Sequence, residues 1–295
     1  MERKRASDFD PQVLKLFDQY VHGGIDRRGF LEKASKYAVG GVTAAMLLDE
    51  LSPRFAEAQQ VAKDDKRLTT EYLPFPSPQG NTKTRGYLVR PAGAKEKLPG
   101  VLVVHENRGL NPHIEDIARR VALDSFVVFA PDALAPLGGY PGDEDSARQM
   151  FAKLDQARTR EDFVAAAAFL KGRPECTGRI GVVGFCWGGG IANMLATRLP
   201  DLGAAVPFYG NQPSAEDTAK IKAPLLIHYA ENDERINAGW PAYEAALKAN
   251  HVPYTMYKYP GTQHGFNNDT TPRYDEAAAK LAWQRTIDFF NKHLR

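Results

Sequence analysis

From about Val61 onwards, short apolar stretches alternate with longer segments in which apolar residues recur every three or four positions. The short stretches have the composition of β-strands, and the longer ones have the period of amphipathic helices. The predicted strands are 71–75, 84–90, 101–105, 126–130, 180–183, 204–208, 225–229 and 254–259. The predicted helices are 114–123, 143–156, 160–171, 187–198, 241–249 and 274–293. This alternation indicates an α/β fold, with a mostly parallel sheet covered by helices on both faces.

Two regions of the predicted sheet can be placed from their sequence. Residues 101–105 are continuously apolar after a Pro-Gly pair, which is typical of a central strand buried on both faces. Residues 71–75 and 84–90 are separated by the turn-forming stretch Ser-Pro-Gln-Gly-Asn at 77–81. We therefore expect an opening hairpin that leads into the parallel sheet.

The first 58 residues have a different pattern. Arg27 and Arg28 precede a mildly apolar, Gly- and Ala-rich segment at 37–48, and an A-x-A site ends at Ala58. This order is that of a twin-arginine export signal that is cleaved after Ala58. Departures from the usual signal are the long stretch before the arginines, the acidic Glu32 and the acidic pair that follows the apolar segment. The alternative is an ordinary amphipathic helix that contains two adjacent arginines.

Length and composition limit the domain organisation and the kinds of partner that the chain can have. With 295 residues, of which 43% are hydrophobic, the chain can bury one large core. The predicted organisation is an export segment over 1–58 and one α/β domain over 59–295. The net charge of +2 comes from scattered, balanced residues, which argues against a nucleic-acid surface. No apolar run approaches the ~20 residues of a membrane span.

These properties lead to expected partners and a location. Small molecules are the expected ligands, and the twin-arginine translocation machinery is the expected protein partner. The mature chain is expected in the periplasm or outside the cell, or in the cytoplasm if the first 58 residues are not removed.

Residues 179–191, R-I-G-V-V-G-F-C-W-G-G-G-I, combine a strand, a sharp turn and the start of a helix. Such a turn lifts the side chain at its apex, here Cys186, out of the sheet. In the G-x-S-x-G elbow of α/β-hydrolases the apex residue is the nucleophile, and glycines flank it because a Cβ there would collide with the backbone. The following helix directs free N–H groups at the sulfur, which favours the thiolate.

Two further reactive residues follow predicted strands later in the chain. Asp233 lies in the loop after residues 225–230, and His264 lies in a Gly-flanked loop after the strand that ends near residue 259. Parallel sheets place their chemistry at the carboxyl ends of the strands, so these two residues and Cys186 are expected to lie together. The order nucleophile, acid, histidine is that of α/β-hydrolase triads.

Each member of this set also has a structural interpretation. A cysteine is more often a small buried apolar residue than a nucleophile, and an aspartate in such a loop is often a turn former or helix cap. His264 could be a loop histidine with satisfied hydrogen bonds. Glu231 or Glu234 could replace Asp233 as the acid, although the motif order favours Asp233.

The second cysteine, Cys176, is the one candidate disulfide partner of Cys186. The intervening strand of about six residues places the two roughly 20 Å apart. Because a disulfide needs Cα atoms within about 7 Å, we expect no disulfide and a packing role for Cys176.

Four segments carry a resemblance to a known family. They are G-F-C-W-G-G at 184–189, H-E-N-R-G at 105–109, P-D-A-L at 131–134 and G-T-Q-H-G-F at 261–266. Together they resemble the dienelactone hydrolase family, also called carboxymethylenebutenolidases, over roughly Leu68 to the C-terminus. The resemblance implies an α/β-hydrolase fold and a triad formed by the cysteine, aspartate and histidine described above.

The same resemblance implies further roles at the site. It places Glu106 beside the resting cysteine, where the carboxylate would take the thiol proton when substrate enters. It assigns the oxyanion hole to the backbone N–H groups of Trp187 and Asn107. The thiolate would attack an ester carbonyl, and water activated by His264 would hydrolyse the thioester.

Glu106 has a simpler alternative, in which it only forms an ion pair with Arg108 or Arg119. His105 and Glu106 do not form a zinc motif, because Gly109 stands where H-E-x-x-H requires its second histidine. The glycines after the cysteine also lack the lysine of a phosphate-binding loop. No metal or nucleotide cofactor is expected.

One departure from the family concerns the substrate. Members that act on dienelactone carry two arginines that clamp the substrate carboxylate, and the corresponding places here hold Pro136 and Asn268, with Arg273 too far along the chain to assign. This puts dienelactone itself in doubt. Tyr140 and Phe266 are the candidate pocket residues for a less charged ester.

Two functions from different classes follow. The first is a cysteine-dependent hydrolase of carboxylic esters or lactones. The second is a catalytically silent protein of the same fold that binds a ligand or a partner, which the complete set of nucleophile, acid and histidine disfavours.

Overall fold

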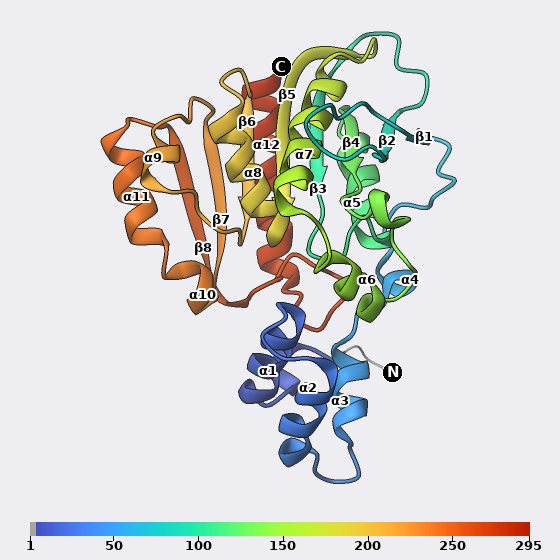
Figure 1. The fold of residues 1–295 in the computed structure, drawn as a ribbon, viewed down its shortest axis with the longest axis vertical. Helices are drawn as coiled ribbons and strands as arrows, with labels where there is room; N and C mark the ends of the chain where they lie inside the picture. Colours follow the sequence, from blue (N-terminus) through green and yellow to red (C-terminus); the bar gives the residue numbers. More distant parts are fainter. Residues whose placement is uncertain (1–3) are drawn as a thin grey trace.

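The computed structural model describes residues 4–295, and its centre is one sheet of eight strands. The strands are β1 (Leu68–Leu73), β2 (Gly86–Pro91), β3 (Leu98–Val104), β4 (Val127–Pro131), β5 (Cys176–Phe185), β6 (Ala204–Phe208), β7 (Leu225–Asn232) and β8 (Tyr254–Gln263). Their order across the sheet is β1-β2-β4-β3-β5-β6-β7-β8 (Figure 1). β2 is antiparallel to both β1 and β4, and the strands β3 to β8 are parallel to one another. The mostly parallel sheet and the opening hairpin are confirmed.

Helices cover both faces of the sheet (Figure 1). After the first strands they are α5 (Pro112–Leu123), α6 (Glu144–Phe151), α7 (Gln156–Lys171), α8 (Trp187–Arg198), α9 (Ala215–Thr218), α10 (Glu234–Asn237), α11 (Trp240–Ala249) and α12 (Glu276–Leu294), with a 3-10 turn η3 (Ala135–Leu137). Buried residues of α7, α8 and α11 form the core on one face, and those of α5 and α12 form the core on the other.

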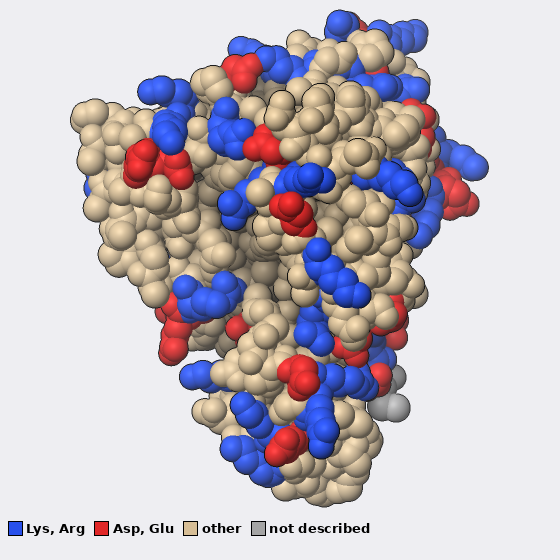
Figure 2. Space-filling model, in the orientation of Figure 1, with Lys and Arg blue, Asp and Glu red and all other residues tan. Residues whose placement is uncertain are grey.

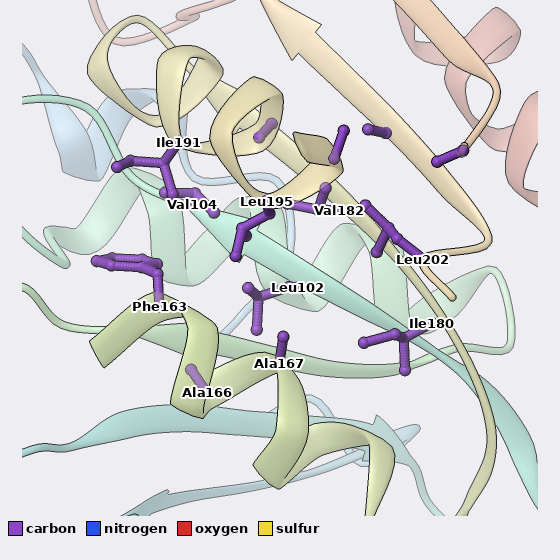
Figure 3. Close-up of a cluster of buried hydrophobic side chains, with 14 of the residues drawn as sticks. Leu102, Val104, Phe163, Ala166, Ala167, Ile180, Val182, Ile191, Leu195 and Leu202 are labelled. Atoms are coloured by element: carbon purple, nitrogen blue, oxygen red, sulfur yellow. The ribbon is translucent and has the colours of Figure 1, made fainter. Parts of the chain in front are cut away.

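The alternation of side chains along the central strands builds these two cores. In β3, Leu102 and Val104 face one core, whereas Val101 and Val103 face the other, as the period of two in a strand requires. Figure 3 shows Leu102 and Val104 packed with side chains of α7 and α8, including Phe163. Burying a side chain such as Phe163 stabilises the fold by about 1.5–3 kcal/mol. The sheet is therefore held rigidly under the loops at its carboxyl end.

Residues 4–58 fold as a small helical unit beside the sheet (Figure 1, blue). Its elements are η1 (Ala6–Asp8), α1 (Pro11–Val21), α2 (Arg27–Ala34), η2 (Ser35–Tyr37), α3 (Ala44–Leu51) and α4 (Phe55–Ala58). Asp10, Asp26 and Thr43 cap the N-termini of the three longer helices by accepting backbone N–H bonds. The unit has its own core, in which Phe30 is fully buried. Arg27 and Arg28, the arginine pair of the predicted export signal, are the first two residues of α2.

Some element boundaries differ from those predicted. The predicted helix 143–156 ends earlier, at Phe151, and the predicted helix 160–171 begins earlier, at Gln156, because Asp155 caps α7 by accepting bonds from the N–H groups of Ala157 and Arg158. Strand β5 begins at Cys176, before the apolar run, where it pairs with the start of β3. Both cysteines are free, and they lie at opposite ends of β5. Among residues 4–295, no helix is both long and apolar enough to cross a membrane.

Candidate active site

The elbow after β5 holds Cys186 in a left-handed conformation, with φ 56° and ψ −114°. This conformation is strained for a residue with a Cβ, and such strain is typical of functional turns. The glycines around it are required by close packing. A Cβ on Gly184 would lie 2.0 Å from the carbonyl oxygen of Gly188, and a Cβ on Gly188 would lie 2.4 Å from the oxygen of Val104. The elbow therefore fixes the sulfur above the end of the sheet.

The loops after β7 and β8 bring Asp233 and His264 together. Oδ2 of Asp233 lies 2.5 Å from Nδ1 of His264, and both side chains are buried. Asp233 also caps α10 by accepting a hydrogen bond from the N–H of Ile236, so the same side chain contacts His264 and acts as a helix cap. Of the other acid candidates, Glu231 accepts a bond from the Gly261 N–H at 2.8 Å. The histidine is thus paired with Asp233.

The other nitrogen of His264, Nε2, is buried and has no hydrogen-bond partner among the described residues. A ring nitrogen of His264 lies within 4.8 Å of the Cys186 sulfur. Burial raises the pKa of the thiol, but the charges of His264 and His22 outweigh it and lower that pKa to about 6. Burial lowers the pKa of His264, but the thiolate and Asp233 outweigh it and raise that pKa to about 10. A thiolate–imidazolium pair is therefore stable between these values.

A second histidine, His22, contacts the same sulfur and was not anticipated from the sequence. It follows the end of α1 in the helical unit, and its Nε2 lies 3.4 Å from Sγ of Cys186. Its ring stands edge-on to that of His264, with centroids 4.7 Å apart. The sequence signal was weak, because only the spacing of Asp18 and His22 by one helical turn marks it. It also falls in the segment assigned to export.

Several contacts hold the end of α1 at this site. The carbonyl oxygen of Val21 accepts hydrogen bonds from the side chains of Asn107 and Arg108. Asp145 accepts from the hydroxyl of Tyr20 and from Arg27, the first of the paired arginines. The helical unit is therefore anchored next to the thiol.

Glu106 lies at the same edge of the sheet, where its Oε2 accepts a hydrogen bond from Asn268 at 2.9 Å. Glu106 does not form the ion pairs with Arg108 or Arg119 that were considered from sequence. Arg108 instead lies 3.6 Å from Glu144, and Arg119 pairs with the two carboxylates of its own helix, Glu115 and Asp116. Asn268, which replaces an expected arginine, thus orients this carboxylate.

The backbone N–H groups of Trp187 and Asn107, the two proposed oxyanion donors, make no hydrogen bond to another described residue. No hydrogen bond of residues 4–295 engages the backbone N–H of Trp187, the first residue of α8, or that of Asn107. Both groups are free to bind an oxygen, as an oxyanion hole requires.

The expected pocket residues take different places. Tyr140 is partly buried, donates to Glu144 at 3.0 Å and packs edge-on against Phe55. Phe266 is fully buried against Phe208, Tyr209 and Tyr259, which assigns it to the core because it turns inward after Gly265. A hollow of about 220 Å³ lies beside α8 and is lined in part by Trp187.

The arginine question also changes in three dimensions. Pro136 lies in η3 and has no charged group that could replace the expected arginine. Arg273, although far along the chain from His264, lies close to the site in three dimensions. The loop after His264 folds back, with the Asp275 N–H bonded to the Phe266 oxygen at 3.0 Å. Arg273 is buried there, 3.8 Å from Asp18 of α1. Distance along the chain was therefore a poor reason to set it aside.

Three side chains at this site could together hold a metal ion. His22, Cys186 and His264 each offer one ligand atom, and these atoms lie within 4.8 Å of one another. Nδ1 of each histidine faces a carboxylate, as in many metal sites. The guanidinium of Arg235 lies 3.2 Å from Nε2 of His22, and this positive charge disfavours a metal cation at the same nitrogen, so we do not assign these residues as metal ligands.

The sheet, its crossover helices and the elbow define an α/β-hydrolase. Residues 84–294 match the dienelactone hydrolase family, and the chain belongs to this family. It is accordingly a hydrolase of carboxylic esters or lactones. Residues 1–39 separately match a family described as YqhI-like.

Known proteins support this membership. The "Putative hydrolase fragment YghX" of Escherichia coli strain K12 is 50% identical over 114 residues, which are 39% of this chain and 97% of that protein. A "Putative carboxymethylenebutenolidase" of the same strain is 30% identical over 79% of this chain and 90% of its own length. The crystal structure of a "Putative Dienelactone Hydrolase" from Klebsiella pneumoniae is 28% identical and covers 76% of this chain and 99% of its own, with a TM-score of 0.68.

Proposed function

We propose that the hydrolase uses Cys186 as its nucleophile, with His264 as the base and Asp233 as the acid of the triad. The observation that carries this proposal is the position of the sulfur. It sits at a strained elbow, beside a buried histidine whose second nitrogen is held by a carboxylate at 2.5 Å. A cysteine with only a packing role, such as Cys176, has none of these neighbours.

Acylation begins from the thiolate. Sγ of Cys186 forms a bond to the ester carbonyl carbon, and the carbonyl electrons move to the oxygen, which the N–H groups of Trp187 and Asn107 stabilise. The carbon–oxygen bond to the leaving group then breaks, and the imidazolium of His264 gives that oxygen its proton. The product is a thioester on Cys186.

Deacylation uses the same residues in reverse. Neutral His264 takes a proton from water, the hydroxide attacks the thioester, and the thiolate leaves. Asp233 holds the imidazole by Nδ1, which directs Nε2 at the reacting atoms and stabilises the imidazolium. Glu106, whose carboxylate is oriented by Asn268, is proposed as a further proton acceptor for the fraction of Cys186 that is still a neutral thiol when substrate enters.

The substrate class follows from the groups near the thiol. Pro136 and Asn268 cannot bind a carboxylate bidentately, which favours a weakly charged acyl or aryl ester. Arg273 is brought near the site by the folding of its loop, and in this structure its guanidinium faces Asp18. A carboxylate-bearing lactone belongs in any substrate panel for this reason.

The test is a panel of p-nitrophenyl esters of increasing acyl length, with lactones with and without a carboxylate. Wild type should hydrolyse at least one of them, and Cys186→Ala should lose the activity. Cys176→Ala is the matched control and should keep it. Equal rates in wild type and Cys186→Ala would reject the nucleophile.

We also propose that residues 1–58 direct export through the twin-arginine machinery, which places the mature enzyme in the periplasm or outside the cell. The support is the order of the arginine pair, the Gly- and Ala-rich segment and the A-x-A site. This route carries folded proteins, so Cys186 would be buried before it meets an oxidising compartment. Before any cleavage, His22 of this segment lies against the thiol.

A further inference from the structure

His22 contacts the thiol, and the proposed triad does not use it. It comes from a separate helical unit, 164 positions from Cys186 in sequence, yet its Nε2 approaches the sulfur to 3.4 Å. The side chain is 16% exposed, so the contact lies largely out of water. A histidine that only covers the site need not aim a nitrogen at the sulfur.

The hydrogen bonds of His22 define which nitrogen is free. Nδ1 lies 2.8 Å from the backbone oxygen of Asp18 and 3.1 Å from its carboxylate. Both are acceptors, so Nδ1 carries a proton, and the lone pair of Nε2 in the neutral ring faces both the sulfur and the guanidinium of Arg235. His22 therefore bonds the backbone oxygen of Asp18 and has its carboxylate nearby, whereas His264 bonds the carboxylate of Asp233 directly, and the thiol faces two imidazoles that each have a carboxylate at Nδ1.

The charges around His22 come from several elements. Cys186 and Asp18 favour the protonated ring, while burial, His264 and the guanidinium of Arg235 at 3.2 Å oppose it. Burial lowers the pKa of His22, but the thiolate and the carboxylate outweigh it, and the pKa is raised. Arg273 acts indirectly, because it lies 3.8 Å from the Asp18 carboxylate.

We propose that His22 is a second thiolate-stabilising residue, delivered to Cys186 by the N-terminal helical unit. The S–H bond of a neutral thiol breaks with both electrons left on sulfur, and the proton passes to Nε2 of His22 when His264 is already protonated. Asp18 remains a carboxylate throughout. The uncut chain thus holds its nucleophile ionised with two imidazoles instead of one. This inference rests on Cys186 being the nucleophile.

The test measures ionisation of the thiol and needs no substrate. The rate of alkylation of Cys186 by iodoacetamide is followed against pH on the full chain, with the modified cysteine identified by peptide mass. Wild type should show a midpoint near pH 6. His22→Gln should raise that midpoint by about one unit, and Asp18→Asn should raise it less. Lys15→Gln, on the exposed side of the same helix, is the matched control and should not move it.

The sign of the shift separates an electrostatic role from a covering role. If His22 only covers the thiol, its removal hydrates the sulfur, and the midpoint stays or falls while the limiting rate at high pH rises. That result, or equal midpoints in His22→Gln and Lys15→Gln, overturns the proposal. Asp18→Asn keeps the imidazole in place and answers the same question should His22→Gln fold poorly, as judged by thermal melting. A shifted midpoint without ester hydrolysis would defeat the proposed function and leave this inference standing.

Discussion

At Cys186, burial and charge act in opposite directions on one thiol. Burial alone would keep the sulfur protonated, but two imidazoles lie close enough to reverse this and bring the thiol pKa to about 6. The same coupling raises the pKa of His264 to about 10. The reactive form of the site is therefore a property of the group of residues and not of the cysteine alone.

The first residue-level prediction concerns pH. The thiolate forms as pH rises through about 6, and the imidazolium of His264 is lost as pH rises through about 10. Catalytic efficiency, kcat/KM, should therefore rise across the lower value, level off, and fall across the upper one. Rates of ester hydrolysis from pH 5 to 11 provide the check. An efficiency that is flat from pH 5 to 7 would show that Cys186 does not ionise there.

The second residue-level prediction concerns Asp233, the proposed acid of the triad. Asp233→Asn should keep the fold but lower kcat by about 10²–10⁴, because the asparagine cannot stabilise the imidazolium of His264. Glu231→Gln is the control, since Glu231 binds only the exposed Gly261 N–H and should change kcat little. Steady-state kinetics of both variants test which carboxylate is the acid of the triad, and a larger loss of kcat in Glu231→Gln would assign that role to Glu231.

At the scale of elements, the elbow depends on glycines that let strand and helix backbones touch. The ideal Cβ of Gly188 lies 2.4 Å from the Val104 oxygen, whereas that of Gly190, in the same helix, meets nothing closer than 3.7 Å. Gly188→Ala should therefore destabilise the protein by about 1–3 kcal/mol and lower activity by moving Cys186. Gly190→Ala should be neutral or stabilising by up to about 1 kcal/mol. Urea unfolding of both variants tests this, and equal stabilities would contradict it.

Periodicity in the sequence predicted the elements that make the sheet and its long helices, because each buries a continuous apolar face. It did not predict α9 or α10, which have four residues each and too few positions to show a period. It placed the end of α6 and the start of α7 a few residues too late, since the cap at Asp155 is a local hydrogen bond that the apolar pattern does not contain. The order Cys186, Asp233, His264 placed three site residues, because parallel strands end at one edge of a sheet.

At the scale of the whole molecule, the site combines two parts of the chain that the sequence separates. Figure 2 shows basic and acidic side chains interspersed on the helical unit and the larger domain above it. Charge pairs such as Arg27 with Asp145, 3.0 Å apart, join them. His22 was missed as a site residue and Arg273 was set aside, because docking of the helical unit brings His22 to Cys186 and loop folding brings Arg273 to Asp18, and a linear pattern contains almost no sign of either contact.

Export is a prediction at this scale. If residues 1–58 are a cleaved signal, the protein from a periplasmic fraction should begin near Gln59, and replacing Arg27 and Arg28 with lysines should leave it in the cytoplasm. Sequencing the N-terminus of the native protein is the measurement, with Lys15→Gln as a control that should be exported normally. A start at Met1 in the cytoplasm would contradict export and would leave His22 permanently at the thiol.

The central claim is that Cys186 carries the acyl group during turnover. The most direct measurement is rapid quenching of the enzyme during hydrolysis of a p-nitrophenyl ester, followed by intact-mass and peptide mass spectrometry. We predict one acyl group per chain, attached to Cys186 and absent from Cys186→Ala, which should also be inactive. Hydrolysis at an undiminished rate by Cys186→Ala, or an acyl group on another residue, would contradict the account.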